Sequence, residues 1–191
     1  MSRWHAGVRV LGALVLLAAA REARAGAELE VYRFRTQEDA AKPPDAAVCA
    51  GAPFETTVKL GASIHRAPPG GERERSVGTA TACIRITAAN RLVPGEQLPM
   101  HVRFTLPEGD FTASGTCQVV SNDVPEAGLV LAGCALKLVE VPAGYLGGMV
   151  SSTSVFNPKK LPGHATGSYY TLTVYRGPTK PKAAEAKSSG P

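Results

Sequence analysis

Apolar and polar residues alternate with a period of two along most of this chain. The pattern is strictest over residues 54–64, where every second position from Phe54 to Ile64 is apolar or threonine. Such alternation predicts a half-buried antiparallel strand, because successive side chains of a strand point to opposite faces. Similar stretches recur, separated by turns rich in glycine and proline. The predicted strands cover residues 29–35, 54–64, 76–88, 99–106, 111–121, 129–141, 145–156 and 168–176.

These eight segments, with no segment of helical period between them, predict an all-β protein. We expect an eight-stranded antiparallel β-barrel, because closure removes the exposed edges of an open sheet. A β-sandwich is the alternative. Residues 36–53 are predicted as a loop held by Cys49, since Pro43 and Pro44 oppose regular structure there. The barrel is expected to form a single domain over residues 26–176.

Both ends of the chain differ in composition from the middle. Residues 1–25 combine basic residues, the apolar run Val10–Ala20 and small residues before Gly26, as in a secretory signal peptide. We expect cleavage between Ala25 and Gly26 and export of a bacterial protein to the periplasm or the medium. The apolar run is shorter than the roughly 20 residues that span a bilayer, so no membrane span is expected. Residues 177–191 are expected to be a disordered basic tail.

The four cysteines lie after the signal segment, and an even number in an exported chain predicts two disulfides. Cys117 and Cys134 flank a turn near residue 125, which would place them opposite each other. Elimination then pairs Cys49 with Cys83. A metal site is not expected, because the chain has no C-x-x-C pair and its cysteine spacing is unlike a zinc module. No cofactor motif is present, so no cofactor is expected.

Charge excludes one class of partner. The chain holds 21 Lys and Arg against 16 Asp and Glu, a net charge of +5. The signal segment contains four arginines and one glutamate, so the remainder carries 17 basic and 15 acidic residues, or +2. A nearly neutral body argues against a nucleic-acid-binding protein of the usual strongly basic kind.

No catalytic signature is present, neither a nucleophile elbow nor a metalloprotease, phosphate-loop or dinucleotide motif. Arg85 and Arg103 project from the polar faces of successive strands, where they would hold an anion only if those faces lined a lumen. Because apolar faces normally fill the interior, we expect both arginines at the surface. The histidines His65, His101 and His164 are also expected there. The candidates for a catalytic role are Asp110, Arg85, Arg103 and Tyr170.

Several turn and glycine motifs occur in an order that resembles a known family. Val77-Gly78 leads a strand carrying Cys83, and Leu106–Gly109 precedes Phe111 and Gly115–Cys117. The glycine-rich stretch Gly144–Gly148 and the closing segment Tyr170–Tyr175 follow. Over residues 29–176 the chain resembles bacterial members of the allene oxide cyclase and dirigent barrel superfamily. The resemblance implies an eight-stranded barrel with an apolar lumen, a small hydrophobic guest and frequently a trimer, so a homo-oligomer is an open expectation. Lipocalins are a competing eight-stranded family.

Three functions follow from these observations. The first is an exported, disulfide-stabilised barrel that binds a small hydrophobic molecule, which requires an interior void. The second is a structural or interaction protein of the envelope or extracellular space, which an exposed apolar patch would favour. The third is a cyclase-like isomerase or dirigent-type enzyme, which requires polar side chains converging inside the barrel.

Overall fold

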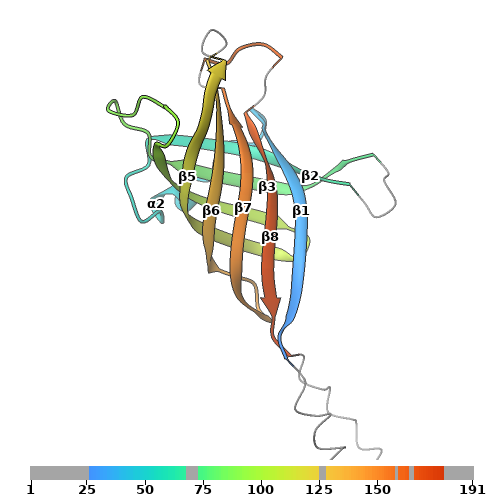
Figure 1. Cartoon of the computed structure of the whole chain (residues 1–191). Helices are drawn as coiled ribbons and strands as arrows, with labels where there is room; N and C mark the ends of the chain where they lie inside the picture. Colours follow the sequence, from blue (N-terminus) through green and yellow to red (C-terminus); the bar gives the residue numbers. More distant parts are fainter. Residues whose placement is uncertain (1–25, 68–72, 125–127, 158, 164–165, 179–191) are drawn as a thin grey trace, which may run out of the picture.

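The computed structural model describes residues 26–67, 73–124, 128–157, 159–163 and 166–178. In it, eight antiparallel strands pair in sequence order and close into a barrel, with β1 hydrogen-bonded to β8 (Figure 1). The predicted barrel is confirmed, and the β-sandwich alternative is wrong. The signal segment and residues 179–191 lie outside the described residues. The elements are β1 (Glu28–Glu38), α2 (Ala46–Ala50), β2 (Val58–Arg66), β3 (Arg75–Ile84), β4 (Gln97–Leu106), β5 (Gly109–Val124), β6 (Leu129–Glu140), β7 (Tyr145–Phe156) and β8 (Gly167–Arg176).

Strand β2 begins at Val58, four residues later than the alternation predicts. Residues 54–57 keep the alternating exposure of a strand, but they do not form the regular backbone pairing of one. The Thr57 hydroxyl donates to the Ile86 carbonyl and accepts from the Ile86 amide, both at 2.7 Å. This side-chain bridge replaces ladder pairing, so β2 starts later and β3 stops earlier than expected.

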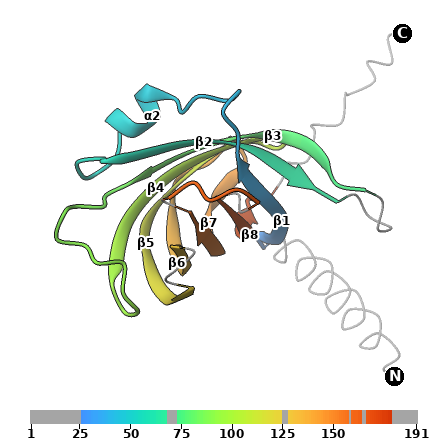
Figure 2. The same cartoon turned by 90° about the horizontal axis from the view of Figure 1, so that it is seen from above.

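Helix α2 lies in the segment for which we predicted a loop. The Asp45 side chain accepts a hydrogen bond from the Ala47 amide at 2.8 Å and caps the helix. Five residues are too few to show a helical period, which is why the pattern did not reveal the helix. Figure 2 shows α2 outside the barrel, over the sheet that contains β2, β3 and β4. Its Val48 and Cys49 are buried against Cys83.

The barrel interior is packed at one end. Aromatic rings occupy the interior from the middle of the barrel to the start of β1 and the end of β8, and we call this half the packed end. Ring centroids of Phe104 lie 5.2 Å from Phe34 and 4.9 Å from Tyr170. Phe111 packs edge-on against Tyr145 at 5.3 Å. These ring contacts belong to the hydrophobic core and occupy much of the interior in this half of the barrel.

A polar cluster covers these rings at the packed end. The Arg176 guanidinium donates to the Tyr145 hydroxyl at 2.6 Å, and its Nε lies 2.5 Å from a Glu30 oxygen. The Tyr32 hydroxyl also donates to Glu30. Hydrogen bonds, first that from Tyr32, lower the pKa of the Glu30 carboxyl. The cluster links the ends of β1, β7 and β8 through side-chain hydrogen bonds.

Candidate binding cavity

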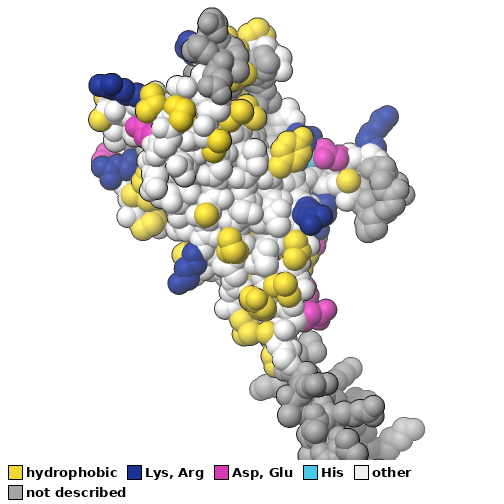
Figure 3. Space-filling view, in the orientation of Figure 1, with side chains coloured by type: hydrophobic (Ala, Val, Ile, Leu, Met, Phe, Trp, Pro, Cys, Tyr) yellow, Lys and Arg dark blue, Asp and Glu magenta, His cyan; other side chains and the backbone are white. Residues whose placement is uncertain are grey.

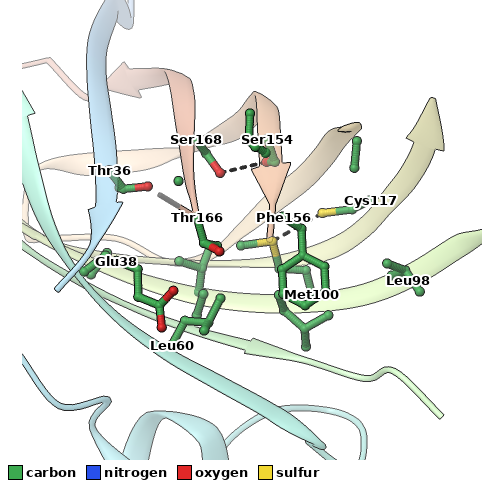
Figure 4. Close-up of a pocket in the computed structure, with 18 of the residues that line it drawn as sticks. Thr36, Glu38, Leu60, Leu98, Met100, Cys117, Ser154, Phe156, Thr166 and Ser168 are labelled. Carbon is green, nitrogen blue, oxygen red and sulfur yellow. Dashed lines mark hydrogen bonds between the residues drawn. The ribbon is translucent and has the colours of Figure 1, made fainter. Parts of the chain in front are cut away.

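The opposite end of the barrel, which we call the open end, contains a cavity lined by residues from all eight strands. The volume of the cavity is about 80 Å³, and the cavity reaches the rim of the barrel near Glu38 and Phe156 (Figure 4). Since one buried water needs roughly 10–15 Å³ on this measure, the cavity accepts about five to eight non-hydrogen atoms. An interior void, on which the binding hypothesis depends, is therefore present.

Small side chains make the cavity. The inward positions of β2, β3 and β6 at this height are Ala62, Ala80, Ala82 and Ala132. At the packed end, inward positions instead carry residues as large as Phe104. Because an eight-stranded barrel is just wide enough for side chains to fill it, alanines at these inward positions leave unfilled space.

One disulfide forms part of the cavity wall. Cys117 and Cys134 are Cα partners on β5 and β6, as their positions about the turn predict. Cys117 lines the cavity, and its sulfur lies 3.3 Å from the Met100 sulfur. The soft, polarisable sulfur atoms of this wall suit an apolar guest. The second bridge joins Cys49 to Cys83 and lies on the outer surface, where it holds α2 against β3.

One wall of the cavity is polar. Thr36, Ser168 and Ser154 are consecutive Cα partners across β1, β8 and β7, and we call them the hydroxyl row. Ser168 donates a hydrogen bond to Ser154 at 2.7 Å. Figure 4 shows Thr36 beside this pair and Leu60 on the far side of the cavity. Below the row, burial raises the pKa of Tyr170 to about 12, so its hydroxyl remains protonated at neutral pH.

The cavity carries no charge in its interior. Among the described lining residues, Glu38 is the one carboxylate, and no lysine, arginine or histidine is present. Glu38 is exposed at the rim. A charged guest inside the cavity would therefore lose hydration without gaining an opposite charge.

The structure does not bring the four catalytic candidates together. Tyr170 is buried at the floor of the cavity. Arg85 and Asp110 are exposed outside the barrel. Arg103 also faces outward, 3.7 Å from the Glu140 carboxylate. The surface position of both arginines follows from the apolar faces filling the interior, as the alternation indicates.

The expectation that His101 is exposed is wrong. The side chain faces outward but is only 6% exposed, and its Nδ1 lies 2.5 Å from the Ser114 hydroxyl. Its Cα partner is Cys83, which forms a disulfide with Cys49 of helix α2. We call residues 39–50, which lie over the outer surface of β2 and β3, the covering segment. Burial lowers the pKa of His101. His65 is half-buried at the end of β2, and His164 lies outside the described residues.

Sequence reasoning missed the hydroxyl row, although a signal was present. Ser154 shares the parity of Val150, and Ser168 shares the parity of Tyr170 and Leu172, all of which are buried. A small polar residue on the apolar parity of a strand marks a polar site facing the interior. Alternation alone could not show that these residues lie at one height, because strand register depends on the tertiary fold.

Two further classes of site were sought among the described residues. No group of three or more His, Cys, Asp or Glu side chains is placed to hold a metal ion there. In the same ranges, no helix is long and apolar enough to cross a membrane.

Comparison with known proteins adds a distant structural likeness. No protein family matches the sequence, and no curated protein does. Among solved structures, the chain is similar to a nonspecific heme-binding cyclase that catalyses a [4 + 2] cycloaddition in neoabyssomicin biosynthesis. The identity is 19% and the TM-score 0.40, over 93% of this chain and 83% of that chain. A likeness of this size carries no conclusion about activity or ligand.

Proposed function

We propose that this protein is an exported β-barrel that binds a small apolar molecule in the open-end cavity. The observation that carries the proposal is an interior space with largely apolar walls in a barrel whose other half contains packed aromatic rings. Water in such a space makes few hydrogen bonds with the walls, so a guest that replaces it gains hydrophobic free energy. The cavity size corresponds to a guest of about one substituted ring.

Export and family are part of the same proposal. Two disulfides are typical of proteins that fold in an oxidising compartment, which supports secretion or a periplasmic location. The closed eight-stranded barrel is the fold that the resemblance to the allene oxide cyclase and dirigent superfamily implies. We place the folded domain at residues 26–176, after removal of the signal segment.

Filling the cavity tests the proposed function. Ala132 lines the cavity, whereas Ala135 on the same strand is exposed outside the barrel. Ala132→Leu places three additional carbon atoms in the cavity and should weaken toluene binding at least tenfold. Ala135→Leu, the matched control, should leave binding unchanged. Titration of the mature protein with toluene, followed by the NMR signal of the Met100 methyl group, measures both; equal affinity in both variants would contradict a guest in the cavity.

An exposed apolar surface favours a second candidate function, that of an interaction protein of the envelope or extracellular space. Leu29, Val31, Leu146, Met149 and Tyr175 are 48–66% exposed on the outer faces of β1, β7 and β8. Figure 3 shows apolar side chains gathered on this face towards the packed end. If the patch joins two copies of the chain, sedimentation velocity should show a dimer that Met149→Lys dissociates. A monomer at all concentrations would show that the patch does not join two copies of the chain.

A cyclase-like or dirigent-type enzyme has less support from the geometry. Of the four candidate residues, only Tyr170 reaches the cavity, and its raised pKa makes it a poor base at neutral pH. An acid–base mechanism built on Asp110, Arg85 or Arg103 would require these outward-facing side chains to act on a guest on the other side of the barrel wall.

A further inference from the structure

We infer that the cavity selects uncharged guests that carry one hydroxyl or carbonyl oxygen, and that Thr36 of the hydroxyl row binds this oxygen. The inference rests on the proposed function and names the chemical class of its ligand. A phenol, a cyclic alcohol or a cyclic ketone of about seven non-hydrogen atoms belongs to this class.

Thr36 provides the first step of the argument. Its side chain is only 6% exposed and lines the cavity. Among the described residues, its hydroxyl has no hydrogen-bond partner. The Thr36 oxygen is not among the fully buried unpaired side-chain atoms, so water in the cavity can reach it. A guest oxygen at this position would take the place of that water and accept the hydroxyl proton.

Ser168 provides the second step. It donates its proton to Ser154 at 2.7 Å, so its oxygen retains acceptor capacity that can face the cavity. Thr36 and Ser168 are Cα partners on adjacent strands, so their side chains project from neighbouring positions on one wall. This wall therefore presents the Thr36 hydroxyl next to the Ser168 oxygen, which the Tyr170 hydroxyl also approaches. A guest hydroxyl can use both, and a carbonyl oxygen can use the donor.

The other walls of the cavity determine the polarity of the rest of the guest. The β3 and β4 side of the cavity is formed by Ala80, Ala82, Ile84, Leu98, Met100 and Val102, none of which has a strong hydrogen-bonding side chain. The body of the guest must therefore be apolar. An ionised group is disfavoured, because the only charged side chain of the described lining is the exposed Glu38 at the rim.

Toluene and phenol test this inference directly, because they have nearly the same shape and differ by one hydroxyl. Thr36→Val keeps the shape of the side chain and removes its hydroxyl. The variant should weaken the binding of phenol about three- to tenfold, which is the effect of losing one hydrogen bond. The affinity for toluene should not change. Thr171→Val, on the same strand as Ser168 but outside the cavity, is the matched control and should change neither affinity.

Ser168→Ala provides an independent variant should Thr36→Val fail to fold, and it should weaken phenol selectively in the same way. Both affinities are measured by the NMR titration of the mature protein described above. If wild-type protein binds neither probe, the proposed function fails and this inference fails with it. If wild-type protein binds both probes, but Thr36→Val and Ser168→Ala leave phenol unaffected or weaken toluene equally, only the inference is overturned.

Discussion

Burial controls the protonation of two side chains on opposite faces of the barrel wall. Inside, it raises the pKa of Tyr170 to about 12 and keeps a neutral hydroxyl at the cavity floor. Outside, it lowers the pKa of His101, which is covered together with Cys83 by the α2 segment. In both cases the side chain is kept uncharged at neutral pH, as desolvation requires.

The buried state of His101 predicts a pH-dependent stability. Because its pKa in the folded protein lies below the ordinary value of 6.5, the unfolded chain binds more protons between these two values. The free energy of unfolding therefore falls as the pH drops from about 6.5 towards the lowered pKa. Urea unfolding at pH 7 and pH 5 should show this loss, and His101→Gln should reduce the difference.

A His101→Gln protein with the same pH dependence as wild type would show that His101 does not titrate differently in the folded and unfolded states.

At the level of elements, the segment before α2 crosses β2 so closely that a glycine is needed. A Cβ atom built on Gly61 would lie 1.7 Å from the carbonyl oxygen of Lys42. The Asp39 amide donates to the Gly61 carbonyl at 3.1 Å, and the Asp39 carboxylate accepts from Ser63 at 2.6 Å. These contacts, together with the Cys49–Cys83 bridge, hold the covering segment on the outer surface.

Gly61→Ala should therefore lower the free energy of unfolding by about 1–3 kcal/mol, the usual effect of overpacking a tight contact. Gly133→Ala on β6 is the control, because its Cβ would meet its nearest atoms at 3.8 and 3.9 Å. That variant should be neutral or slightly stabilising, since alanine restricts the unfolded chain more than glycine does. Equal stability of the two variants in urea would contradict the close crossing at Lys42.

The strands could be predicted because each one has a buried and an exposed face. Neighbouring residues alone show this, since apolar and polar side chains alternate along the strand. The disulfide across the turn between β5 and β6 followed for the same reason. Helix α2 could not be predicted, because it consists of a single capped turn stabilised by contacts with Cys83. The burial of His101 was missed with it, since the covering segment is distant in sequence from β4.

For the whole molecule, the division between a packed and an open end determines what the barrel can do. Alternation shows which side chains face inward, but not which of them meet at the same height. That depends on the register of all eight strands, which places Phe34, Phe104 and Tyr170 together at one level. The cavity above them consequently could not be derived from the sequence, although its alanines and hydroxyl residues were visible there.

The central claim is that the open end holds a small guest, and a crystal structure of the mature protein soaked with toluene tests it most directly. Our account predicts electron density for one ring between Met100 and Ser168, and no such density in Ala132→Leu crystals. A cavity filled by the protein's own side chains, or toluene bound only on the outer face around Met149, would contradict it.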